Sequence, residues 1–100
     1  MAVIATVKGK AYESTKTMHA EEVMFASLGS KSTFDVEMNG WPCCRGERHK
    51  NCHALFIKKS KGGVITVTIN GDKGGYAADH EKDFGSTGKI TYTDGVVSYG

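Results

Sequence analysis

Alternation of apolar and polar residues predicts strands along most of the chain. Residues 2–7 (AVIATV) alternate weakly and predict a first strand, and residues 8–14 (KGKAYES) are expected to turn back beside it. Residues 33–38 (TFDVEM) alternate as a third strand. Residues 63–70 (GVITVTIN) are rich in β-branched side chains, which favour strands.

Helical spacing predicts two helices between these strands. In residues 17–29 (TMHAEEVMFASLG), Thr17 is the expected N-cap and Gly29 the expected C-terminal stop. The apolar residues of that helix recur at helical spacing, namely at Ala20, Val23, Met24 and Leu28. Residues 51–62 (NCHALFIKKSKG) predict a second helix with Asn51 as N-cap and lysines near its C-terminal end. Its inward-facing residues are expected to be Cys52, Leu55 and Phe56.

The last twelve residues, KITYTDGVVSYG, predict a β-hairpin around Asp94 and Gly95, which suit a two-residue primed turn. The register that follows pairs Tyr92 with Val97 and Ile90 with Tyr99, and it places all four on one face. Residues 71–88 show no clear periodicity and are expected to form a loop with at most a short helical turn.

Together these elements predict one α/β domain, α+β in style, that spans residues 1–100. We expect a mixed central sheet, two helices packed on it and an antiparallel C-terminal hairpin. The length suits an excised domain or a very small protein.

Composition excludes some classes of protein. A hydrophobic content of 39% and a charged content of 24% are ordinary for a soluble domain, and no apolar run is long enough to cross a membrane. Residues 1–10 lack the basic start and apolar block of a signal peptide. A net charge of +2 does not by itself indicate nucleic-acid binding, although basic residues gather within residues 45–50 and 58–61.

Reactive side chains gather in residues 40–53 (GWPCCRGERHKNCH), which contain all three cysteines, the only tryptophan and proline, both arginines and two of the four histidines. Three cysteines cannot all pair, and a disulfide between the adjacent Cys43 and Cys44 would be strained. A metal site or a reactive thiol is therefore favoured over a disulfide framework.

The starts of the two predicted helices carry residues that bind metals. His19 and Glu21 are two positions apart, or about 200° around a helix, so they can share a site only from its first turn. Cys52 opens the second helix, where the positive end of the helix favours thiolate. One histidine and two thiolates form a three-ligand zinc site, and a carboxylate that is not a ligand can move protons beside it.

The motif "HAE" at the start of one helix, followed by a strand and "PC…C" at the start of another, resembles the zinc-dependent cytidine deaminase superfamily, whose signature is H-x-E…P-C-x-x-C. The resemblance covers residues 18 to about 69 and implies the deaminase fold. It implies that His19, Cys43 and Cys52 hold Zn²⁺ and that Glu21 transfers protons. It also implies that the Ala20 amide and the Trp41 carbonyl contact the base, and Pro42 is grouped with these substrate-binding residues.

The spacing of the cysteines departs from that signature. Eight residues separate Cys43 from Cys52, where the family usually has two, and Cys44 is therefore a rival ligand. Cys43 is preferred because it directly follows Pro42. The intervening loop would lie at the mouth of the site, where Arg45, Arg48 and Lys50 are expected to contact nucleic-acid phosphates.

The histidine in the first ligand position and the short chain resemble compact bacterial toxin domains more than free cytidine deaminases. We therefore expect an enzyme that deaminates cytosine to uracil in single- or double-stranded DNA. As a toxin domain, it would be exported, act as a monomer in the target-cell cytoplasm and require an immunity partner. Within the superfamily, the alternative is an adenine or RNA deaminase.

Two further alternatives come from outside the superfamily. One is a non-catalytic zinc-stabilised nucleic-acid-binding module, with ligands from Cys43 or Cys44, His49, Cys52 and His53. In that case His19 and Glu21 would be ordinary surface or capping residues. The other is a cysteine nucleophile paired with a histidine, for which the sequence has no local signature.

Overall fold

The structure is a computed structural model, and it describes residues 4–16, 18–29, 31–42, 52–71 and 88–99. The elements follow one another as β1 (Ile4–Val7), β2 (Lys10–Glu13), α1 (Ala20–Leu28), β3 (Phe34–Met38), α2 (Cys52–Lys59), β4 (Val64–Ile69), β5 (Lys89–Thr93) and β6 (Val96–Tyr99). This is the predicted order of two strands, helix, strand, helix, strand and hairpin.

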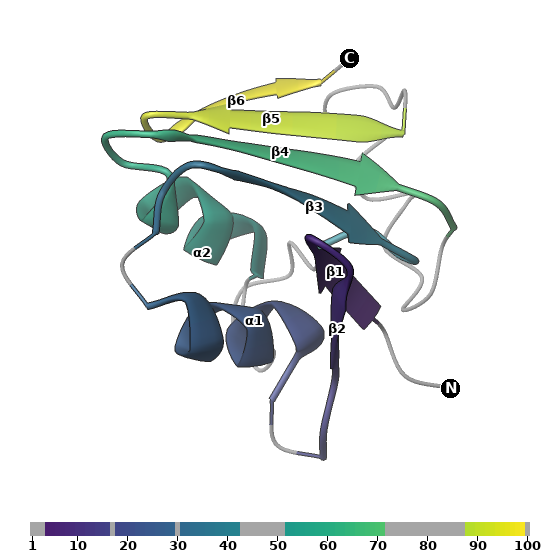
Figure 1. Ribbon diagram of the computed structural model, residues 1–100. Coiled ribbons are helices and arrows are strands. Elements are labelled where there is room, and N and C mark those ends of the chain that lie inside the picture. Colours follow the sequence, from purple (N-terminus) through teal and green to yellow (C-terminus); the bar gives the residue numbers. More distant parts are fainter. Residues whose placement is uncertain (1–3, 17, 30, 43–51, 72–87, 100) are drawn as a thin grey trace.

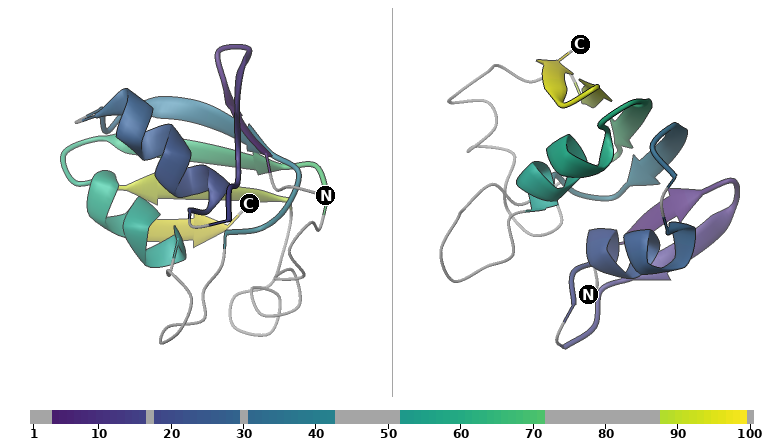
Figure 2. Two further views of the ribbon diagram at one scale, coloured as in Figure 1. Left: turned by 90° about the horizontal axis from the view of Figure 1, so that it is seen from below. Right: turned by 90° about the vertical axis from the view of Figure 1, so that its left-hand side faces the viewer.

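The six strands form one mixed sheet in the order β2-β1-β3-β4-β5-β6. β3 and β4 are parallel and are connected through α2, as a parallel pair requires, whereas the other neighbours are antiparallel. Both helices lie on the same face of the sheet (Figures 1 and 2). The predicted mixed sheet with two helices on it is thus confirmed at the level of an α+β fold.

Strand alternation decides which side chains meet the helices. Along β3, Phe34, Val36 and Met38 are buried, while Asp35 and Glu37 are exposed. The same period of two buries alternate residues of the neighbouring strands under the helices, including Ala5, Val7, Ile65, Val67, Ile90 and Tyr92. The opposite face of the sheet carries acidic side chains and threonines, so the hydrophobic core lies in a single layer.

Aromatic rings form a continuous series of contacts through that core. Phe25 of α1 packs edge-on against Phe34 of β3 at 5.9 Å and against Phe56 of α2 at 5.2 Å between ring centroids. Phe56 stacks on Tyr92 of β5 at 5.1 Å, and Tyr92 contacts the ring of His53 at 5.5 Å. Phe56, which was expected to face inward, is therefore found in the core together with Phe25 and Phe34.

The start of α1 differs from the prediction. The helix begins at Ala20, and its N-cap is His19, with an extended backbone (φ −72°, ψ 159°), rather than Thr17. A turn precedes the helix, because Thr15 Oγ1 accepts a hydrogen bond from the Met18 amide (3.0 Å) and the Thr15 amide donates to the Met18 carbonyl (2.8 Å). This turn delays entry into the helix by two residues. Thr17 itself lies outside the described residues.

The C-terminal end of α1 agrees with the prediction, whereas α2 ends at Lys59, three residues before the predicted Gly62. Gly29 ends α1 with φ 67°, a conformation that glycine adopts without strain. The second helix begins at Cys52, the position that follows the predicted cap. Asn51, and residues 72–87 of the expected loop, lie outside the described residues.

The C-terminal hairpin has the predicted register. Tyr92 pairs with Val97 and Ile90 with Tyr99. Asp94 and Gly95 both have positive φ, as the expected primed turn requires. This turn is fastened to the segment between α2 and β4 by three hydrogen bonds, in which Ser60 Oγ accepts from the Gly95 amide, Asp94 Oδ1 from the Gly62 amide and the Gly63 carbonyl from the Asp94 amide.

Within the described ranges, no helix has the length and apolarity to cross a membrane.

Candidate metal centre

The first component of the site is the N-cap of α1. The extended backbone of His19 lets its side chain project past the helix end, as the sequence predicted for a residue that shares a site with Glu21. The backbone of His19 is held by Glu22, because the His19 amide donates a 2.8 Å hydrogen bond to Glu22 Oε1. Glu22 thus provides the carboxylate half of a capping box.

Glu21 occupies the first turn of α1 and is one of only two buried polar or charged side chains among the described residues. It is 3% exposed, although its neighbour Glu22 is only half-buried. A buried carboxylate is costly unless it is hydrogen-bonded, paired with a cation or bound to a metal. Its burial therefore points to a specific role at this helix end.

Cys52 is the first residue of α2 and is completely buried. Its Sγ lies 3.1 Å from His19 Nδ1, so the starts of the two helices meet although 33 positions separate these residues. The N-terminal position on α2 places the sulfur near the positive end of a helix, which favours the thiolate that binds metals.

These three side chains form one group. A ligand atom from each of His19, Glu21 and Cys52 lies within 4.8 Å of the other two, close enough for all three to approach one metal ion. Imidazole nitrogen, thiolate sulfur and carboxylate oxygen are all ligand types for zinc. The sequence predicted that His19, Glu21 and Cys52 would come together, and the structure places them so.

The structure also places three further predicted site residues, namely Ala20, Trp41 and Pro42. Ala20 is fully buried in the first turn of α1, directly between His19 and Glu21 in sequence. Trp41 is 6% exposed and its ring stacks on Tyr99 of β6 at 6.4 Å. Pro42 is fully buried at the end of the described segment. The roles assigned to the Ala20 amide and the Trp41 carbonyl remain predictions.

The remaining predicted residues lie outside the described part of the chain. They are the ligand Cys43, its rival Cys44, the phosphate-binding residues Arg45, Arg48 and Lys50, and His49 of the alternative zinc module. Cys43 directly follows Pro42, so the preferred third ligand is the next residue along the chain from the described segment.

Two contacts at or next to the site were not predicted from the sequence. Glu22 is one, and its signal was present as the three-residue spacing from His19 that a capping box requires. The other is Tyr92, whose hydroxyl lies 2.7 Å from Nδ1 of His53, the residue that follows Cys52 in the chain. The 39 positions between His53 and Tyr92 left no local signal for that contact. His53 is thus engaged with β5, while Cys52 is grouped with α1.

Comparison of the chain with protein-family models, with curated proteins and with solved structures finds no match.

Proposed function

We propose that the chain is a zinc-dependent deaminase of the cytidine deaminase superfamily, of the compact toxin type, that converts cytosine to uracil in DNA. The observation that carries this proposal is the 3.1 Å approach of His19 Nδ1 to Cys52 Sγ with the buried Glu21 beside them. The strand and helix order, and the motif H-x-E followed by P-C and a further cysteine, support the same proposal.

The donor set fits zinc. A neutral imidazole and thiolates bind this metal, and the residues lie at two helix starts that are held in place by the core. His19 and Cys52 would hold the ion together with Cys43, or Cys44 in its place. When bound, zinc would act as a Lewis acid that makes water acidic enough to react near neutral pH.

Glu21 is the residue for proton transfer. Its carboxylate is buried at the first turn of α1, out of competition with bulk solvent. In the proposed reaction it accepts one proton from the attacking water and delivers it to N3 of the cytosine ring. It then takes the second proton of that water, from the new hydroxyl at C4, and delivers it to the departing amino group as the C4–N bond breaks. Cytosine and one water thus yield uracil and ammonia. The carboxylate is restored at the end of each cycle.

The DNA substrate is supported by the basic residues of the segment that joins the two halves of the motif. Arg45, Arg48 and Lys50 are of the types that contact phosphates. A base within a duplex would have to be unstacked and turned into the site, at a cost of a few kcal/mol. By analogy with the superfamily, the Ala20 amide and the Trp41 carbonyl would then contact its edge.

The test is to incubate the zinc-loaded protein with single- and double-stranded DNA of mixed sequence and to sequence the products. We expect cytosine-to-thymine changes with the native protein and none with Glu21→Gln, which keeps the size of the side chain and removes the proton carrier. The matched control is Glu37→Gln, because Glu37 is an exposed carboxylate on β3. This control should retain full activity.

Parallel incubations with RNA and with adenine-containing strands separate the substrates within the superfamily. Changes confined to adenine or to RNA would replace cytosine in DNA as the assigned substrate. Binding of nucleic acid without turnover on any substrate would refute the enzymatic proposal and favour a zinc-stabilised binding module.

A further inference from the structure

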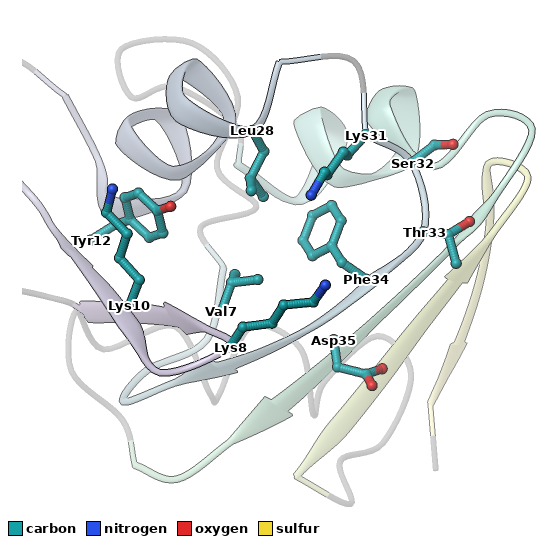
Figure 3. A pocket seen from close by; sticks show the side chains of 10 residues that line it. All are labelled: Val7, Lys8, Lys10, Tyr12, Leu28, Lys31, Ser32, Thr33, Phe34 and Asp35. Atoms are coloured by element: carbon teal, nitrogen blue, oxygen red, sulfur yellow. The ribbon is translucent and has the colours of Figure 1, made fainter.

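A second feature lies at the other end of α1. A hollow of about 870 Å³ opens between the β1–β2 turn and the segment that joins α1 to β3 (Figure 3). Leu28, at the C-terminal end of α1, lines it, whereas the His19, Glu21 and Cys52 group surrounds the N-terminal end. The length of α1 separates the two places by about 12 Å along the helix axis.

The floor of the hollow is apolar and partly aromatic. Val7, Tyr12, Leu28 and Phe34 line it, and the Tyr12 hydroxyl is fixed by a 3.3 Å hydrogen bond to Ser27 Oγ. The volume falls in the range of small-molecule sites, which combine an apolar lining with a few polar groups. Phe34 and Tyr12 are 9% and 8% exposed, so a flat ring would pack across the four side chains together rather than stack on one of them.

The rim of the hollow is basic. Lys8 comes from the β1–β2 turn, Lys10 from β2 and Lys31 from the segment after α1. In Figure 3 the Lys8 and Lys31 side chains extend toward the Phe34 ring from opposite sides. The Lys10 ammonium lies 5.4 Å from the centroid of the Tyr12 ring. Three like charges around one hollow repel one another, and an anion bound between them would relieve that repulsion.

The hollow contains little negative charge to balance these lysines. Asp35 is the one carboxylate among the described lining residues, and it points away from Phe34 in Figure 3, as neighbouring residues of a strand do. Ser32 and Thr33 are the remaining polar residues of the lining, and the Thr33 hydroxyl is directed to β4, where it accepts a hydrogen bond from the Val64 amide. The complementary ligand is therefore an anion.

The kind of basic residue favours phosphate over carboxylate. Planar, bidentate recognition of carboxylates is the strength of arginine, whereas lysine binds phosphate as a compact charge. Aromatic surfaces within a positively charged groove are the usual platform for single-stranded nucleic acids. We propose that this hollow binds a nucleotide of a single strand, with its base against the apolar floor that includes Phe34 and its phosphates between Lys8 and Lys31.

This inference does not rest on the proposed deaminase activity, because it uses other residues and requires no cytosine. The test measures binding of fluorescent oligothymidine by anisotropy over a range of salt concentrations. Removing two phosphate contacts in the double variant Lys8→Ala/Lys31→Ala should lower the slope of log K against log salt by about 1.4, at about 0.7 per contact. The matched control is Lys58→Ala/Lys61→Ala, which removes the same charge from exposed positions near the end of α2. This control should leave the slope nearly unchanged.

Two further measurements locate the strand and test the role of the base. Amide chemical shifts should move at residues 8–10 and 31–34, and Phe34→Leu, checked for folding by thermal unfolding, should bind oligothymidine no better than an abasic strand. Equal losses in the two lysine variants, or shifts confined to the His19–Cys52 region, would overturn the proposal. So would equal binding of abasic and thymidine strands by the native protein, or equal competition by an acidic peptide.

Discussion

His19 Nδ1 lies 3.1 Å from Cys52 Sγ, and this contact joins the starts of two helices that are 33 positions apart. The helices otherwise meet in the core through the Phe25 and Phe56 rings. A metal held by His19 and Cys52 would therefore close a long loop of chain and contribute to folding as well as to chemistry.

Removal of a ligand should abolish stoichiometric zinc binding. We expect His19→Ala and Cys52→Ser to lose zinc, as measured by elemental analysis of the purified proteins, because each variant lacks one ligand of a three-residue site. Glu21→Gln should retain zinc, because its carboxylate is assigned to proton transfer. Loss of zinc from Glu21→Gln would instead make Glu21 a ligand.

Zinc should stabilise the native protein against urea. With free zinc at a hundredfold excess over Kd, binding to the folded state alone contributes about 2.7 kcal/mol to the free energy of unfolding. Addition of a chelator should therefore shift the unfolding midpoint downward in the native protein. The midpoint of Cys52→Ser should be unaffected by the chelator, and an equal shift in that variant would place the zinc elsewhere.

Glu22→Ala should destabilise the start of α1. The substitution removes the 2.8 Å hydrogen bond from the His19 amide, which costs about 1 kcal/mol in the free energy of unfolding. Glu22→Gln should lose less, since its amide oxygen can still accept that bond. Urea unfolding measures both variants, and equal stability of the two would argue against the capping role.

Tyr92→Phe should leave the core packed but remove a buried polar contact. The ring still stacks on Phe56, while the hydroxyl 2.7 Å from His53 Nδ1 is lost, at a cost of about 1 kcal/mol. Tyr92→Ala should cost about 3–5 kcal/mol, because it also creates a cavity. Thermal or urea unfolding measures the free energy of unfolding of both variants. An equal loss in Tyr92→Phe and Tyr92→Ala would contradict the prediction that the hydroxyl contributes only its contact with His53.

Gly63→Ala should destabilise the protein at the segment that joins α2 to β4. A Cβ at this position would meet the Ser32 carbonyl oxygen, a backbone atom that cannot move aside cheaply, and we expect a cost of about 3 kcal/mol. Gly62 is the comparison, because a Cβ there meets nothing within 4 Å and only its positive φ of 79° opposes alanine. Gly62→Ala should cost about 1 kcal/mol, and the reverse order in urea unfolding would contradict the predicted clash.

Local patterns predicted the elements well because each carries its own signal. The alternation of residues 33–38 specifies which residues of β3 are buried, and the Asp94-Gly95 turn specifies the register of the last two strands. The cap of α1 was assigned wrongly because histidine is not a preferred N-cap, and the turn made by Thr15 and Met18 has no strong sequence signature.

The candidate site was predictable where motif spacing encodes it. His19, Glu21 and Cys52 stand at helix starts that could share a sheet edge, and the resemblance to the deaminase signature implied that they form one site. The contact of His53 with Tyr92 and the hollow beside Phe34 depend on how distant segments pack against one another. No local period in the sequence specifies those contacts.

The series of rings through the core has a consequence for how the domain opens. Phe25 touches both Phe34, which lines the hollow, and Phe56, which stacks on the tyrosine beside the α2 start. Because Phe25 of α1 and Phe56 of α2 pack against each other, detachment of either helix from the sheet would expose the ring of the other. The backbone amides of α1 and α2 should therefore exchange their hydrogens with solvent at the same opening free energy, as members of one cooperative unit.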